Sequence, residues 1–339
     1  MNAPEHDQPV SPFLLHGGQL RLARARFPSA PEPWIDLSTG ICPWPYPIPE
    51  LPVECWSRLP DALDLEALLR QARTAYRVPE AAALAAVAGT DLAISLLPRL
   101  VTPAAQVSIV SPTYSSHEKS WAAAGHRVRR VSEPGEIGTD GIGVVVNPNN
   151  PDGRRSQPAE LYKAAARLRD RGGFLVVDEA FCDVTPELSV LNGACSLANI
   201  VVLRSFGKFY GLAGVRLGFV ATAHPIGEAV IQAMSDWPIS GPAIAIGTAA
   251  LADVTWTQRT RKRLAATAAR LDETLRAARF EIAGGTSLFA LARHPRAYLM
   301  FERLADQGIL VRPFEGSLLR FGLPNGEAHF VRLKQALAV

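Results

Sequence analysis

Short apolar runs alternate with helical segments through the middle of this 339-residue chain, and this alternation limits the possible folds more than any other feature. The runs are rich in valine and isoleucine, and each ends in a polar or glycine-containing loop; they cover residues 84–87, 106–110, 142–146, 174–177 and 200–203, and a last run begins at Val215. Strands that are apolar on both faces and joined by helices are typical of a sheet covered on both sides. The sequence therefore predicts an α/β fold with a mostly parallel sheet.

The alternation stops after residue 223. Helical patterns there lead into short apolar runs near residues 289, 309 and 318, which predicts a smaller α+β domain. Prolines recur between residues 28 and 60 and disfavour long regular elements, so this segment is expected to be an extended arm. The predicted organisation is an N-terminal arm of residues 1–50 packing on the small domain, a large domain of residues 51–240 and a small C-terminal domain of residues 241–339.

The charge and cysteine content exclude several classes of protein. The formal net charge is only +3 and the basic residues are scattered, so no nucleic-acid or membrane partner is expected. The chain has four cysteines, Cys42, Cys55, Cys182 and Cys195, and none is spaced for a metal site, so no metal is expected. The N-terminal residues lack the apolar core of a signal peptide. We therefore expect a cytoplasmic protein.

Polar residues follow directly on the ends of the apolar runs. Helices after parallel strands present their N-termini at the same edge of the sheet, where ligands bind. The residues concerned are Gly89, Thr90, Tyr114, Asn150, Asp178, Ser205 and Lys208. The sequence therefore predicts one binding site beyond the carboxyl ends of the strands.

Lys208 lies in the glycine-rich stretch 205–218, between two expected strands. Ser205 lies three residues before it and Arg216 eight residues after it, and a hydroxyl with a guanidinium suits a phosphate dianion. A lysine amine beside a phosphate site indicates an aldehyde cofactor held as a Schiff base, with pyridoxal 5′-phosphate (PLP) as the leading candidate. The structural alternative is an ordinary solvated loop lysine.

Three further strand-end residues suit such a cofactor. Asp178 can pair with a protonated pyridine nitrogen, Tyr114 can stack on the ring, and Asn150 can donate to its phenolic oxygen. Each has a structural alternative: a helix cap for Asp178, a core aromatic for Tyr114 and a turn residue for Asn150.

Three ordered motifs resemble those of the fold-type I PLP enzymes, the aspartate-aminotransferase superfamily of classes I and II. They are the asparagine motif at residues 147–153, the Asp-Glu-Ala-Phe run at residues 178–181, and Ser205-x-x-Lys208 followed by Gly214-x-Arg216-x-Gly218. The resemblance implies a large domain with a mostly parallel sheet of roughly seven strands and a smaller α+β domain. It also implies a homodimer, because such sites are usually completed across a two-fold interface.

The resemblance assigns a role to each site residue. Lys208, Asp178 and Tyr114 would be catalytic, with Lys208 forming the covalent link to PLP and shuttling protons. His117 would back Asp178, and the substrate carboxylate would bind Arg320. The residues implied for cofactor binding are Gly89, Thr90, Asp91, Tyr114, His117, Asn150, Asp178, Ser205, Lys208 and Arg216, and those implied for substrate binding are His16, Gly40, Asn150, Arg312 and Arg320.

Residues 16–18, residues 36–43 and the loop around Lys208 resemble one branch of the superfamily, the threonine-phosphate decarboxylases of cobalamin biosynthesis. That branch implies a small phosphorylated amino acid as substrate, L-threonine O-3-phosphate, and (R)-1-amino-2-propanol O-2-phosphate as product. The runner-up is a histidinol-phosphate-type aminotransferase, and a further alternative is a non-catalytic assembly component. The sequence departs from its relatives at Phe181 and Leu59, where many relatives carry a tyrosine.

Overall fold

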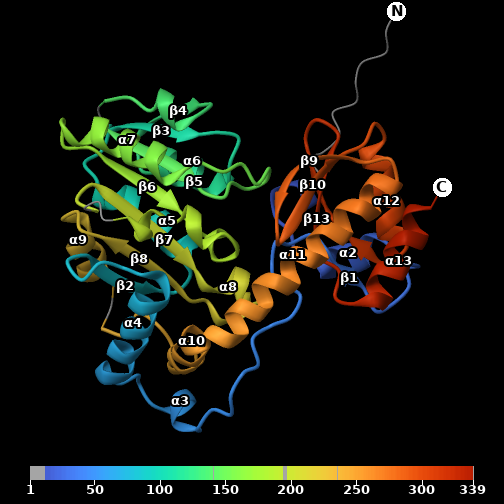
Figure 1. Cartoon of the computed structure of the whole chain (residues 1–339), viewed down its shortest axis with the longest axis horizontal. Coiled ribbons are helices and arrows are strands. Elements are labelled where there is room, and N and C mark those ends of the chain that lie inside the picture. The colour runs from blue at the N-terminus through green and yellow to red at the C-terminus, as the bar shows by residue number, and fades with distance from the viewer. Residues whose placement is uncertain (1–11, 140, 194–196, 235, 339) are drawn as a thin grey trace, which may run out of the picture. The chain divides into compact units, whose positions relative to one another are not determined.

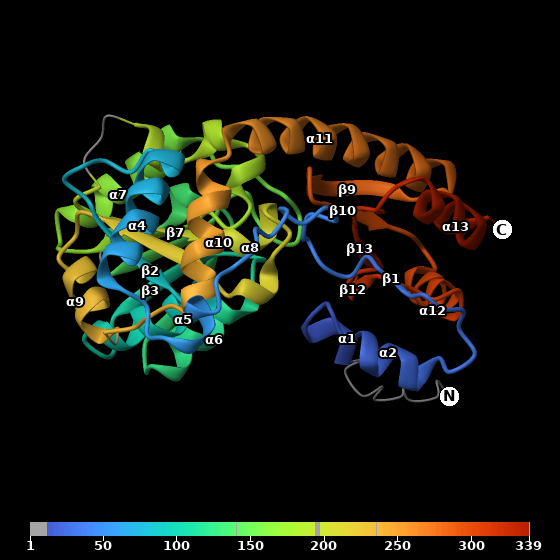
Figure 2. The ribbon, with the colours of Figure 1, turned by 90° about the horizontal axis from the view of Figure 1, so that it is seen from below.

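The computed structural model describes residues 12–139, 141–193, 197–234 and 236–338, which divide into two compact units. The larger unit is Trp44–Lys262, and the smaller one combines Met1–Pro43 with Arg263–Val339. These bounds differ from the predicted ones at 50 and 240. Residues 241–252 belong to the larger unit because they form a helix that packs along the helix Ala62–Tyr76 (Figure 2).

The larger unit is built on a seven-stranded sheet within the described part of the chain (Figure 1). All neighbouring strands are parallel except β8, which runs antiparallel to both β2 and β7. The order across the sheet is β2 (Ala83–Val87), β8 (Gly218–Thr222), β7 (Ile200–Ser205), β6 (Phe174–Asp178), β5 (Ile142–Val146), β3 (Gln106–Val110) and β4 (Arg127–Val131). This confirms the predicted α/β class and the mostly parallel sheet.

Helices cover this sheet. Those of the larger unit are α3 (Glu54–Ser57), α4 (Ala62–Tyr76), α5 (Thr90–Leu96), α6 (Ser115–Ala123), α7 (Pro158–Arg169), α8 (Phe206–Phe209), α9 (Ile226–Ala233), α10 (Gly241–Ala252) and the first part of α11 (Val254–Ala277). Short 3-10 turns add η1 (Leu97–Leu100), η2 (Pro134–Glu136), η3 (Cys182–Val184), η4 (Pro186–Leu188), η5 (Val190–Asn192) and η6 (Ala213–Val215).

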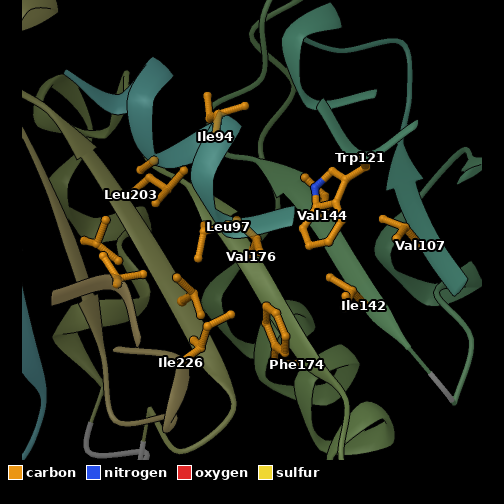
Figure 3. Packing of buried hydrophobic residues seen from close by; sticks show 14 of the residues in the cluster. Ile94, Leu97, Val107, Trp121, Ile142, Val144, Phe174, Val176, Leu203 and Ile226 are labelled. Atoms are coloured by element: carbon orange, nitrogen blue, oxygen red, sulfur yellow. The ribbon is translucent and has the colours of Figure 1, made fainter. Parts of the chain in front are cut away.

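The core on one face of the sheet is formed by valines and isoleucines of the strands and by apolar residues of α5, α6 and α9 (Figure 3). Trp121 of α6 is 1% exposed and lies among them, with Ile94 of α5 and Ile226 of α9. Because successive side chains of a strand point to opposite faces, a strand buried on both faces must be apolar throughout. This explains why the central strands read as unbroken apolar runs.

Local signals fix the helix boundaries. Helix α7 begins at Pro158 behind a capping box in which Gln157 N donates to Glu160 Oε2 over 2.8 Å.

Strand β4 was not predicted from the sequence, because its residues, RVRRV, form no apolar run. It is an edge strand paired only with β3, and an edge tolerates exposed arginines that discourage pairing with another chain. Helices α6 and α9 also escaped prediction.

The smaller unit contains a four-stranded antiparallel sheet and a short parallel pair. The sheet order is β12 (Arg312–Phe314), β13 (Leu318–Gly322), β10 (Phe289–Arg293) and β9 (Glu281–Thr286); the pair is β1 (Ile35–Asp36) with β11 (Ile309–Leu310). Its helices are α1 (Pro12–Leu15), α2 (Leu20–Arg26), α12 (Ala297–Asp306), α13 (Glu327–Leu337) and the remainder of α11. No helix in the described ranges is long and apolar enough to span a membrane.

Candidate active site

The ends of three adjacent parallel strands in the larger unit form the centre of the candidate site. The register pairs Val146 of β5 with Asp178 of β6, and Asp178 with Leu203 of β7. Asn150 lies on the loop that follows β5, and Lys208 lies on the short helix Phe206–Phe209 that follows β7. The fold thus gathers residues that are far apart in sequence at one edge of the sheet, as the sequence predicted.

Asp178 is the last residue of β6 and is 3% exposed. His117 Nε2 lies 2.9 Å from its Oδ2, and the backbone N of Ala180 donates to Oδ1 over 3.0 Å. A proton on Nε2 makes the histidine a donor. Both oxygens of Asp178 are therefore held in place, which gives the carboxylate a fixed direction.

Lys208 lies on the one-turn helix α8 rather than on the loop that the sequence predicted. Its Nζ is 5.8 Å from the centre of the Phe181 ring. The ring of Tyr210, the residue after α8, stacks on two other rings. Its centre lies 4.5 Å from that of Phe206 and 5.5 Å from that of Trp256. Burial raises the pKa of Tyr210 well above its ordinary value. These rings pack α8 tightly, so the backbone that carries Lys208 has little freedom.

Gly89, at the start of α5, has no side chain, and this allows the Arg216 guanidinium to pack against it. Gly89 has φ +88°, and a Cβ at this position would lie 2.6 Å from Arg216 Nη2. Arg216 Nη2 is 3.6 Å from Asp91 Oδ2, and the Tyr114 hydroxyl donates to Asp91 Oδ1 over 2.9 Å. Burial raises the pKa of Tyr114, so its phenol stays protonated and remains a donor. The Asp91 carboxylate therefore joins Tyr114 to Arg216.

Hydrogen bonds between side chains fix the loop that carries Asn150. Thr113 Oγ1 donates to Asn149 Oδ1 over 2.6 Å, and Asn149 Nδ2 donates to Asp152 Oδ1 over 2.7 Å. Asn147 Oδ1 accepts from Ser156 N over 2.9 Å. Asn150 itself is 8% exposed. The neighbouring asparagines therefore hold the loop, which leaves Asn150 in a defined position after β5.

In the smaller unit, residues 16–18 pack against the turn that follows β1. Gly18 N donates to Ser38 Oγ over 2.7 Å, and a Cβ on Gly17 would lie only 2.3 Å from Ser38 O. His16 is exposed and Gly40 is buried. Arg320 Nη2 donates to the same Ser38 carbonyl over 3.1 Å. Arg320 and residues 17–18, which follow His16, thus contact the same turn, and Gly40 belongs to it.

Arg312 and Arg320 face each other across β12 and β13 and are 8% and 4% exposed. Both guanidinium groups lie near the Phe314 ring, at 4.6 Å for Arg312 and 5.8 Å for Arg320. Burial and the positive charge of Arg312 lower the pKa of Arg320 to about 9. Two buried cations side by side favour binding of an anion, which restores the charge balance.

The structure divides the predicted site residues between the two units. The larger unit brings together Gly89, Thr90, Asp91, Tyr114, His117, Asn150, Asp178, Ser205, Lys208 and Arg216, and the smaller unit holds His16, Gly40, Arg312 and Arg320. Arg204 and Glu179 form a buried ion pair that the sequence patterns did not indicate. The available signal was an arginine placed directly after the apolar run 200–203, where it continues the strand.

Among the described residues, no group of His, Cys, Asp and Glu side chains is placed to hold a metal ion. Cys42, Cys55 and Cys182 are free thiols, and Cys195 lies outside the described residues.

Three comparisons relate the chain to known proteins. The sequence model of the family described as aminotransferase class I and II matches residues 63–332. A threonine-phosphate decarboxylase of Pseudomonas aeruginosa is 44% identical over 96% of this chain and 97% of its own length, and one from Sinorhizobium sp. is 42% identical over 97% and 99%. The crystal structure of histidinol-phosphate aminotransferase from Sinorhizobium meliloti with pyridoxal-5′-phosphate superposes with a TM-score of 0.81 at 19% identity, covering 98% of this chain and 97% of that one.

Proposed function

This chain belongs to the class I and II aminotransferase family, and we propose that it is a PLP-dependent enzyme that decarboxylates L-threonine O-3-phosphate. The product would be (R)-1-amino-2-propanol O-2-phosphate, for cobalamin biosynthesis. The observation that carries the proposal is the similarity, over nearly the whole chain, to two relatives named threonine-phosphate decarboxylase. The site in the larger unit is consistent with it.

The residues of the larger unit fit PLP. Gly89 lets the Arg216 guanidinium lie against the start of α5, where a Cβ would be only 2.6 Å from Nη2, and a cation beside free backbone amides suits a phosphate. Ser205, Arg216 and the amides of Thr90 and Asp91 would hold that phosphate, and the buried Asp178 carboxylate would face the ring nitrogen. When bound, PLP supplies an aldehyde for an amine and a ring that accepts the electrons released at Cα.

The chain's own residues would then do three things. The Lys208 amine would bind the aldehyde and move a proton at Cα. Asp178, oriented by His117, would hold a proton on the ring nitrogen. Tyr114 would stack on the ring while Asn150 donates to the phenolic oxygen.

The two anionic groups of the substrate account for the basic residues of the smaller unit. Arg320 would bind the carboxylate because a guanidinium binds a carboxylate through two parallel hydrogen bonds. Arg312, His16 and Gly40 would complete the substrate contacts made by this unit, and Asn150 would supply a contact from the larger unit's own site.

A histidinol-phosphate-type aminotransferase is the second candidate, favoured by the superposition on a solved enzyme of that name. Decarboxylation and transamination need the same cofactor residues and differ in which bond at Cα breaks. Incubating the PLP-loaded protein with threonine phosphate and measuring released CO2 against oxo-acid formation separates the two. CO2 without oxo acid supports the proposal, and oxo acid without CO2 contradicts it. Intact PLP absorbance with neither product indicates the non-catalytic assembly component.

Anion binding should weaken at high pH through Arg320. With a pKa of about 9, only about one-tenth of this side chain stays protonated at pH 10. We expect acetate, a carboxylate probe for Arg320, to bind the PLP-loaded protein roughly tenfold less tightly at pH 10 than at pH 8, measured by calorimetry. The Arg320→Gln variant should bind weakly at both pH values. Equal wild-type affinity at the two pH values would contradict the role of Arg320.

The proposed homodimer should depend on exposed apolar side chains of residues 48–63 in the larger unit. Ile48, Val53, Trp56, Leu59 and Leu63 are 57–70% exposed and lie within sixteen residues of one another along the chain. A partner subunit that covers these side chains would remove them from water. Trp56→Glu should weaken dimerisation at least roughly tenfold, as measured by sedimentation equilibrium. Val331→Glu on α13 is the matched control, and a Trp56→Glu protein with unchanged dimer affinity would exclude this segment from the interface.

A further inference from the structure

A buried cluster of charges lies beside the strand ends that hold Asp178 and Ser205. Arg204 Nη1 donates to Glu179 Oε2 over 2.8 Å, and Nη2 donates to Asp183 Oδ1 over 2.7 Å. The three charged side chains are no more than 4% exposed. Neighbouring residues of a strand point to opposite faces, so Arg204 points away from the face that carries Ser205.

Glu179 is held at both of its oxygens. Ser189 Oγ donates to Oε2 over 2.7 Å, and the backbone N of Val190 donates to Oε1 over 2.8 Å. The guanidinium carbon of Arg204 lies 4.3 Å from the centre of the Tyr76 ring. The guanidinium of Arg204 is thus held in one orientation, by hydrogen bonds to two carboxylates and by packing on the face of an aromatic ring.

Stability alone does not account for this cluster. Removing charges from water is costly, and well-packed apolar residues often replace a buried ion pair without loss of stability. A guanidinium does provide direction, because its donors lie in one plane at fixed angles. The fixed guanidinium therefore holds the Glu179 side chain in one orientation.

Holding the Glu179 side chain also restrains the backbone on either side of this residue. Glu179 N donates to Leu203 O over 2.9 Å, which extends the pairing of β6 and β7 by one residue. The next backbone N, that of Ala180, donates to Asp178 Oδ1. Holding the Glu179 side chain therefore fixes the peptide group that orients the Asp178 carboxylate.

We propose that Arg204 is a positioning residue which, through Glu179, fixes the direction of the Asp178 carboxylate. Arg204 immediately precedes Ser205 at the end of β7, so the same contact holds the strand that leads to Lys208 in register with β6. The inference rests on the proposed function, in which Asp178 pairs with the ring nitrogen of PLP.

The test compares two conservative variants with a matched control. Arg204→Lys keeps the charge and loses the two-pronged geometry, and Glu179→Gln keeps the shape and loses the charge. Thr222→Val removes the hydrogen bond, 2.7 Å long, from the buried Thr222 hydroxyl to Ile200 O at the opposite end of β7. Each protein is measured for its cofactor-free melting temperature, its PLP dissociation constant and the ¹⁵N resonance of PLP labelled at the ring nitrogen.

We expect all three variants to melt at a lower temperature. Only Arg204→Lys and Glu179→Gln should also bind PLP about tenfold less tightly and move the ¹⁵N resonance towards that of an unprotonated ring nitrogen. Dissociation constants and resonances equal to those of Thr222→Val would overturn the proposal, leaving Arg204 a purely structural residue. If both variants fail to fold, Ser189→Ala, which removes a single donor to Glu179, should show the same two changes, and wild-type values there would overturn it too.

The wild-type protein separates this inference from the proposed function. A wild type that binds no PLP contradicts the proposed function itself. A wild type that binds PLP, with Arg204→Lys indistinguishable from the control, contradicts only the positioning role.

Discussion

Replacing Lys208 with alanine should reduce CO2 release by more than about 10⁴-fold, because Lys208 carries the one amine, among the described residues assigned to the site, that could form the covalent link to the cofactor aldehyde. The helix that carries it is packed by Phe206, Tyr210 and Trp256, and none of these contacts uses the Lys208 side chain. The variant should therefore fold normally, as checked by circular dichroism and by its melting temperature. Activity is measured as CO2 release under saturating PLP.

Lys163→Ala is the matched control, since Lys163 is exposed on α7. Its CO2 release should equal that of the wild type. Borohydride reduction of the wild type should attach PLP to the peptide that contains Lys208, identified by mass spectrometry. Label on another peptide, or appreciable turnover by Lys208→Ala, would refute the assignment.

Asp178→Asn should lower kcat about 10³-fold, because a neutral amide no longer stabilises a proton on the ring nitrogen. Asparagine has nearly the same shape and retains an oxygen that can accept from Ala180 N, which now donates to Oδ1 over 3.0 Å. Substrate binding should change little, so the loss should appear in kcat rather than in KM. Steady-state CO2 release over a range of threonine phosphate concentrations measures both constants.

Asp170→Asn tests whether removing any one carboxylate has this effect, because Asp170 is exposed at the end of α7. This control should keep wild-type kcat. A kcat for Asp178→Asn within tenfold of the wild type would show that Asp178 does not hold the proton on the ring nitrogen.

Much of the larger unit could be predicted from local sequence. The run that became β5 has the predicted bounds because every residue of a strand buried on both faces must be apolar. The edge strand β4 could not be predicted in this way, since its exposed arginines carry no apolar signal and only its pairing with β3 makes it a strand. Helix α8, which carries Lys208, could not be predicted either, because its four residues are too few to show a helical period.

The sequence by itself determined which residues follow the strand ends, and a parallel sheet brings all its carboxyl ends to one edge. Only the tertiary structure decided how each side chain is held. His117 contacts Asp178 across 61 positions of sequence, and Arg204 contacts Glu179 across 25. Such pairs depend on strand order and on the face to which each side chain points, and the spacing of residues along the chain contains neither.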